Sequence, residues 1–164
     1  MTNELLNKYE QLVKTLTEKK LTITTMESCT GGQIASYITD IEGSSNVIKG
    51  AYVTYANETK ILNGVDKKVI DKHGVYSFDC AKAMAKACKD KLGADIGIGV
   101  TGTFSNIDEN NADSIPDNVF VSVLFNDEYT CIGIKLVSGL KRYEAKDVIA
   151  DNVVDRLLSL LKGE

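Results

Sequence analysis

The chain contains a single histidine and a single proline among its 164 residues. One histidine excludes zinc sites built from several histidines, and a Ser-His-Asp triad would have to use His73. His73 precedes Gly74, a pattern typical of a helix end, where a glycine closes the last turn and a basic side chain meets the helix dipole. Helix capping is therefore the better interpretation of His73, and we expect the base of any hydrolysis to be another residue.

Long apolar runs and clusters of basic residues are also missing. No stretch approaches the ~20 apolar residues of a membrane span, and the first residues lack the basic and apolar regions of a signal peptide. The net charge is -4 and the lysines are scattered among acids, which disfavours a nucleic-acid-binding surface. We expect a cytoplasmic protein with neither a membrane nor a nucleic acid as partner.

The four cysteines form no Cys-x-x-Cys pair. In a cytoplasmic protein such thiols are typically reduced and structural. Cys80 and Cys88 have the spacing of one buried helix face. Cys29 is a possible nucleophile, but its sequence neighbourhood identifies no base for it.

The length and a hydrophobic content of 43% predict one globular domain spanning residues 1–164. Hydrophobic periodicity predicts helices near 3–19, 33–39, 57–62, 66–72, 77–92 and 143–161. It predicts strands near 21–26, 47–55, 94–101, 118–125 and 130–137, the last two forming an antiparallel hairpin. Helices alternate with strands early in the chain and the hairpin comes late. We therefore predict a three-layer α/β/α domain with a mixed sheet of about five strands.

The most informative segment is Glu27-Ser28-Cys29-Thr30-Gly31-Gly32, between a predicted strand and a predicted helix. Backbone N–H groups at a helix start lack partners within the helix, and the helix dipole there favours negative charge. Together with the hydroxyls, this turn is suited to a phosphate or an oxyanion. The alternative is an ordinary strand-to-helix turn with a Ser or Thr cap.

Two other patterns are better explained without a function. Gly97-Ile98-Gly99-Val100-Thr101-Gly102 matches the dinucleotide motif Gly-x-Gly-x-x-Gly, but its first two glycines fall inside a predicted strand rather than in a turn that opens a helix. Close packing of small residues in a central strand explains them. Ser138 and Lys141 have the Ser-x-x-Lys spacing without any companion motif, which chance explains.

Two further segments can join the 27–32 turn in one site: Gly43-Ser44-Ser45, and 52–60 with Tyr55, Asn57 and Lys60. With no histidine available, a lysine can activate a serine hydroxyl if burial or nearby positive charge lowers its pKa. Tyr55 can relay a proton, and Asn57 can hold a loop or a polar group of a substrate. Equally, Lys60 can begin a surface helix and Tyr55 can end a strand.

These segments, with 39–45 and 99–102, resemble in order and spacing the C-terminal domain of the competence/damage-inducible protein CinA. The likeness runs from about residue 5 to residue 162. Members of this family that stand alone include nicotinamide-nucleotide amidases of the PncC type, which hydrolyse the carboxamide of nicotinamide mononucleotide without a metal. The resemblance implies a role in pyridine-nucleotide salvage, a small-molecule nucleotide as substrate, no cofactor, and a homo-oligomer.

The resemblance also implies site residues. Ser28, Ser45, Tyr55 and Lys60 match family positions implicated in catalysis, and we expect a serine with Lys60 as its base. Ser45 is our first choice of nucleophile and Ser28 our second. The expected substrate-binding residues surround them: Glu27, Thr30, Gly31, Gly32, Ser44, Asn57, Thr101, Gly102 and Arg142, with Lys141 as the alternative cation for the phosphate.

The chain departs from the family after Gly102. The family typically continues with Ala-Gly-Pro and a glycine-rich loop, whereas this chain has bulkier and partly acidic residues over 103–118, including Asp108 and Glu109. Carboxylates beside a phosphate are unfavourable. Two hypotheses follow: an amidase for nicotinamide mononucleotide or for a different amide, or a catalytically silent protein that binds a nucleotide or a partner chain.

Overall fold

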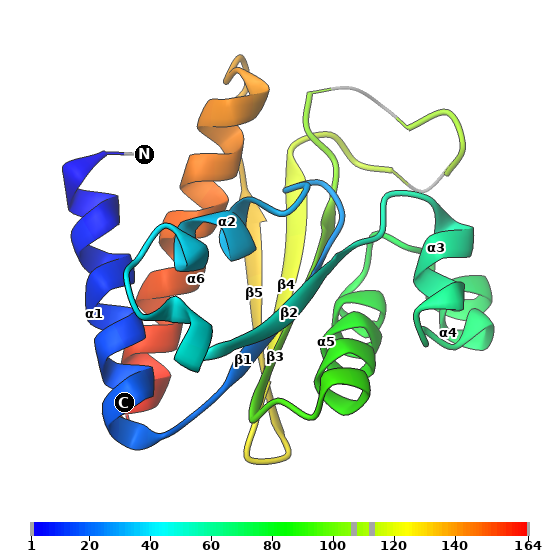
Figure 1. Cartoon of the computed structure of the whole chain (residues 1–164). Helices are drawn as coiled ribbons and strands as arrows, with labels where there is room; N and C mark the ends of the chain where they lie inside the picture. The colour runs from blue at the N-terminus through cyan, green and yellow to red at the C-terminus, as the bar shows by residue number, and fades with distance from the viewer. Residues whose placement is uncertain (1, 106–107, 112–113, 164) are drawn as a thin grey trace.

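The computed structural model describes residues 2–105, 108–111 and 114–163, and within them the chain forms three layers (Figure 1). A five-stranded mixed sheet lies in the middle, in the order β2-β1-β3-β4-β5. Its strands are β1 (Ile23–Glu27), β2 (Ile48–Val53), β3 (Ile96–Gly102), β4 (Asn118–Phe125) and β5 (Glu128–Lys135). The predicted fold class is confirmed.

Helices cover both faces of the sheet (Figure 1). One layer contains α1 (Asn3–Lys19), α2 (Gln33–Thr39) and α6 (Arg142–Lys162), which pack on one another and on the sheet. The opposite layer contains α3 (Asn57–Leu62), α4 (Lys67–His73) and α5 (Phe78–Leu92). A short 3-10 turn, η1 (Ser44–Asn46), precedes β2 where the sequence predicts a loop.

The sheet topology brings three loops together at the carboxyl ends of β1, β2 and β3. β1 runs parallel to both β2 and β3, with Glu27 level with Val53 and Val100. The chain leaves β1 through α2 on one face and leaves β2 through α3, α4 and α5 on the other face. In open α/β sheets, the crevice beyond the carboxyl ends of the strands at such a reversal is the usual ligand site. The segments that follow β1, β2 and β3 therefore meet there.

Several local predictions are confirmed by the helix ends and by the packing of β3. The side chain of Ser77 accepts the backbone N–H of Cys80 and begins α5, and Gly74 with φ 72° follows His73 at the end of α4. A Cβ atom on Gly97 would lie 2.2 Å from the carbonyl oxygen of Ala85 in α5. Gly97 and Gly99, the two glycines inside the strand, thus serve close packing on α5 and are not a nucleotide motif.

Boundaries differ by a few residues from the predictions. β5 begins at Glu128 rather than at residue 130, because Asn126 and Asp127 alone make the hairpin turn, both with positive φ. Asparagine and aspartate tolerate that conformation and are typical of two-residue hairpin turns. The four cysteines, all of them in the described ranges, form no disulfide, and Cys80 and Cys88 are buried as predicted. Among the helices that the structure describes, none has the length and apolarity needed to cross a membrane.

Candidate active site

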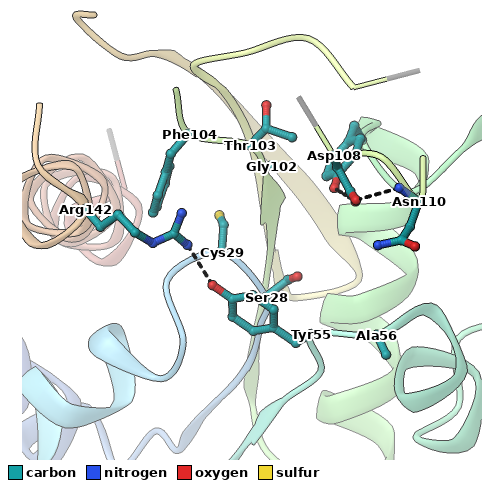
Figure 2. A pocket seen from close by; sticks show the side chains of 11 residues that line it. Ser28, Cys29, Tyr55, Ala56, Gly102, Thr103, Phe104, Asp108, Asn110 and Arg142 are labelled. Carbon is teal, nitrogen blue, oxygen red and sulfur yellow. Dashed lines mark hydrogen bonds between the residues drawn. The ribbon is translucent and has the colours of Figure 1, made fainter. Parts of the chain in front are cut away.

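A cavity of about 470 Å³ opens at the edge where the segments after β1, β2 and β3 meet (Figure 2). Its walls come from five parts of the chain: the turn after β1, the segment after β2, the segment before α5, the end of β3 with the loop that follows it, and the first residue of α6. The residues that line it are Ser28, Cys29, Tyr55, Ala56, Tyr76, Gly102, Thr103, Phe104, Asp108, Asn110 and Arg142.

Ser28 and Lys60 meet beneath this cavity. The Lys60 Nζ lies 3.2 Å from the Ser28 Oγ, and the two side chains are buried, with Lys60 only 2% exposed. Lys60 also donates to two main-chain carbonyl oxygens, those of Thr54 at 2.7 Å and Tyr55 at 3.4 Å. The backbone N–H of Ser28 donates to the Val100 carbonyl and fixes the serine against β3.

The three acceptors around Lys60 suit both protonation states. An ammonium donates to the Ser28 Oγ and to both carbonyl oxygens, whereas a neutral amine donates to the two carbonyl oxygens and accepts the Ser28 hydroxyl with its lone pair. Burial lowers the pKa of Lys60 from its ordinary value of 10.5. None of the ion pairs between described residues includes Lys60. The geometry therefore fits a serine nucleophile with a lysine as its base.

The choice of Ser45 as partner of Lys60 is wrong for a site formed by one chain. Ser45 lies in η1, before β2, whereas Lys60 follows β2. β2 contains six residues and at ~3.3 Å per residue spans about 20 Å. Ser44 and Ser45 therefore lie at the amino end of β2, far from the carboxyl ends of the strands where the cavity opens, and neither lines the cavity. Ser28 is the serine that contacts Lys60.

Glu27 was expected to bind substrate and instead holds the start of α2. Its fully buried carboxylate accepts the backbone N–H groups of Gly32 at 3.1 Å, Ile34 at 3.2 Å and Ala35 at 3.0 Å. The Thr25 hydroxyl donates a fourth bond at 2.9 Å. The chain's own carboxylate thus fills the anion position at the start of α2, and the N–H groups of Gly32, Ile34 and Ala35 are not free for a phosphate or oxyanion.

The neighbouring turn residues have structural roles as well. The N–H of Gly31 donates to the Ser28 carbonyl at 2.9 Å, and Gly31 and Gly32 have φ of 62° and 92°, a conformation that favours glycine. Thr30 is fully buried, and among the described atoms its hydroxyl has no hydrogen-bond partner. Contrary to expectation, none of these three residues lines the cavity.

Thr101 has a structural role, whereas its neighbour Gly102 lines the cavity. The Thr101 hydroxyl is buried and donates to the Val75 carbonyl at 2.8 Å, which ties β3 to the segment before α5. Thr101, which was expected to bind substrate, does not line the cavity. Gly102 does line the cavity. A Cβ atom there would lie 2.6 Å from the Asn118 carbonyl oxygen, so a larger residue would push β4 away.

Tyr55 and Arg142 form the rim. The Arg142 guanidinium donates to the Tyr55 hydroxyl at 2.8 Å and lies over the ring of Phe104, 4.7 Å from its centre (Figure 2). Arg142, and not Lys141, is the cation that lines the cavity. The Tyr55 side chain is 57% exposed and orients Arg142, whereas its main-chain carbonyl contacts Lys60. The described hydrogen bonds do not connect the Tyr55 hydroxyl to Ser28, so the expected proton relay has no support in this geometry.

Asn57 holds a loop, which is one of the two roles expected for it. Its side-chain amide donates to the Asn111 side chain at 2.9 Å. Asn111 donates in turn to Asp108, which also accepts the Tyr76 hydroxyl and the backbone N–H of Asn110. The bonds from Tyr76 and Asn111 lower the pKa of Asp108 to about 2. Residues 108–111, in the part of the chain that departs from the family pattern, are therefore held at the cavity.

Tyr76 and Phe104 line the cavity although the sequence did not predict them as site residues. Neither lies in a recognisable motif: Tyr76 merely precedes the Ser77 cap, and Phe104 follows the strand end.

The sequence alone also leaves Cys29 open as a nucleophile. Burial, with a smaller effect from Glu27, raises the pKa of the Cys29 thiol to about 12, which disfavours a thiolate. Among the described residues, no group of three or more His, Cys, Asp or Glu side chains is arranged to hold a metal ion.

Known proteins match the chain at two levels. A family model described as the CinA C-terminal domain matches residues 6–161. A CinA-like protein of Chlorobaculum tepidum is 46% identical over 94 residues, 57% of this chain and 22% of that protein. A CinA-like protein of Flavobacterium psychrophilum is 42% identical over 113 residues, 68% of this chain and 27% of that protein. The matches thus span 22% and 27% of the length of these relatives.

Solved structures show the same fold. A competence-damaged protein (CinA) superfamily protein from Klebsiella pneumoniae has a TM-score of 0.89 at 18% identity, covering 98% of this chain and 99% of that chain. A competence/damage inducible protein from Agrobacterium tumefaciens has a TM-score of 0.87 at 24% identity, covering 98% and 97%. The whole described domain therefore has the architecture of these two proteins.

Proposed function

The chain belongs to the CinA C-terminal domain family, and from this premise we propose that it is an amidohydrolase. The proposed reaction is hydrolysis of the carboxamide of nicotinamide mononucleotide to nicotinate mononucleotide and ammonia. The observation that supports it is the buried pair of Ser28 and Lys60 at the floor of a cavity, 3.2 Å apart. A buried lysine without a carboxylate partner is otherwise costly, and a role as base explains its place.

In the proposed mechanism, neutral Lys60 takes the proton of the Ser28 hydroxyl while the Oγ attacks the carboxamide carbon. The tetrahedral intermediate collapses to an ester on Ser28, and the Lys60 ammonium returns the proton to the leaving nitrogen, which departs as ammonia. Lys60 then takes a proton from a water molecule that attacks the ester, and Ser28 regains its hydroxyl proton. We expect the backbone N–H of Cys29, next to the nucleophile, to donate to the oxyanion.

Arg142 is the proposed contact for the nucleotide phosphate. A guanidinium presents a planar set of donors that suits phosphate oxygens, and Tyr55 and Phe104 already orient it at the rim. The expected homo-oligomer and cytoplasmic location remain predictions.

A second candidate function is favoured by one observation. Asp108 places a carboxylate in the wall of the cavity, in the loop where the family typically has glycines. If that charge excludes the nucleotide or misplaces its amide, the protein binds a ligand without hydrolysing it, or hydrolyses another amide.

The test is ammonia release by the purified protein from nicotinamide mononucleotide, with nicotinamide, nicotinamide riboside and glutamine as alternative amides. We expect turnover with the mononucleotide to exceed that with the other three, because only it carries a phosphate for Arg142. No turnover with a folded protein would reject the amidase and favour the silent binding protein. Turnover with another amide alone would reject the nucleotide as substrate.

A further inference from the structure

The two sides of the cavity have opposite charge. Figure 2 shows Arg142 against Phe104 on one side, Asp108 with Asn110 on the opposite side, and Ser28 between them. A ligand with its amide at Ser28 therefore lies between a cation and an anion. An anionic group on the substrate accounts for Arg142 but leaves Asp108 unexplained.

Asp108 is a fixed negative charge. Its carboxylate accepts the Tyr76 hydroxyl, the Asn111 side chain at 2.6 Å and the N–H of Asn110 at 2.9 Å. These donors hold it in place, and the low pKa of about 2 that they produce keeps it charged at neutral pH. A carboxylate has about four lone-pair positions, so it retains acceptor capacity toward the cavity.

Asp108 forms no ion pair among the described residues. Its charge acts through space on Lys60, whose pKa it raises, but Lys60 makes its hydrogen bonds to Ser28 and to two main-chain carbonyl oxygens instead. All contacts of Asp108 are with neutral donors, although a carboxylate in a partly desolvated wall is stabilised most by an opposite charge. A cationic part of the ligand would supply that charge.

We propose that Asp108 is a specificity residue that selects amides borne on a cationic ring, while Arg142 holds the anionic group of the same substrate. The proposal rests on the proposed function and extends it: a pyridinium nucleotide carries both charges, and its ring lies next to the reacting carboxamide. The corresponding dihydropyridine nucleotide keeps the amide, ribose and phosphate but has a neutral ring. Asp108 would therefore favour the oxidised over the reduced nucleotide.

The test compares the dissociation constants of nicotinamide mononucleotide and its reduced form. Both are measured by calorimetry on Ser28→Ala protein, which prevents turnover, with and without Asp108→Asn. We expect Asp108→Asn to reduce the preference for the oxidised nucleotide by about tenfold at low salt, from the loss of one charge pair near the surface. Added salt should shrink the preference in the protein that retains Asp108, since ions screen a partly exposed pair.

Two variants control for other effects. Glu109→Gln removes the same charge from the adjacent exposed residue, which does not line the cavity, and should leave the ratio of the two dissociation constants unchanged. Tyr76→Phe removes one bond that holds the loop but keeps the carboxylate, so any loss of affinity should affect both nucleotides equally.

A ratio unaffected by Asp108→Asn would overturn the proposal, whether affinity for both nucleotides is kept or falls equally. An equal fall would mean that Asp108 supports the loop or binds the ribose hydroxyls, which the two nucleotides share. Failure of both nucleotides to bind the Ser28→Ala protein would also overturn it. Ammonia release by the wild-type protein tests the amidase separately. A charge-dependent ratio without ammonia release keeps the proposal for a binding protein, and ammonia release with an unchanged ratio keeps the amidase alone.

Discussion

Replacing Glu27 by glutamine should destabilise the protein strongly although the two side chains have nearly the same shape. One carboxylate oxygen accepts Gly32 and Ile34, and the other accepts Ala35 and the Thr25 hydroxyl. In the variant, one oxygen becomes an NH₂ group that faces N–H donors. Even with the better orientation, the N–H of Ala35 loses its acceptor, while the Thr25 hydroxyl can turn to accept.

The magnitude follows from these losses. A buried N–H without a partner costs about 1–3 kcal/mol, and the loss of a negative charge at a helix start costs about 0.3–2 kcal/mol. Relief from burying the charge offsets part of this sum. We expect a net decrease of about 3 kcal/mol in the free energy of unfolding, which for a chain of this size lowers the Tm by about 6–12 °C.

Thermal unfolding followed by circular dichroism or calorimetry measures this effect. Glu10→Gln is the matched control, because Glu10 is exposed on α1, and its Tm should stay within about 2 °C of wild type. A Tm of the Glu27→Gln protein equal to that of the control would contradict this expectation. In that case the carboxylate would not hold the start of α2.

Three further outcomes are expected. Ammonia release should fall as the pH is lowered through the pKa of Lys60, which burial places below 10.5, because only the neutral amine accepts a proton. Replacing the base in Lys60→Met should lower kcat by at least about 100-fold. A rate that does not change with pH would contradict Lys60 as the base. Arg142→Met should raise KM by about 10–100-fold with little change in kcat, and Tyr55→Phe, which removes the hydroxyl that orients Arg142, should raise KM less. Michaelis curves measure both effects, and a loss confined to kcat would contradict a binding role for Arg142. Iodoacetamide at pH 8 should modify the exposed Cys131 and spare the buried Cys29, as measured by peptide mass spectrometry. Cys29→Ala should retain turnover, and loss of turnover in that variant would implicate the Cys29 thiol in the reaction.

The fold could be predicted from sequence because its signals are local and repeated. Amphipathic periodicity identified α1 and α6, and the Ser77 cap gave the start of α5. Small residues in β3 indicated its central place, where the packing of α5 against Gly97 leaves no room for a side chain. Strand ends were less accurate, since they depend on pairing with distant strands.

The site could be predicted only in part, because its geometry depends on the direction of β2. Two serine-containing turns at 27–32 and 43–45 look equivalent along the chain, but β2 separates Ser45 from Lys60. The helix start at 27–32 predicts an anion, but no local pattern shows that Glu27 itself supplies it in place of a ligand. Contacts of the loop at 108–111 with Tyr76 and Asn57 join segments far apart in sequence, which no local pattern signals.

The central claim is that Ser28, activated by Lys60, is the nucleophile. The most direct measurement is the initial rate of ammonia release from nicotinamide mononucleotide by wild type, Ser28→Ala and Ser45→Ala, with the folding of each verified by circular dichroism. We expect no detectable turnover for folded Ser28→Ala and turnover near wild type for Ser45→Ala. The reverse pattern, with turnover retained without Ser28 and lost without Ser45, would contradict it.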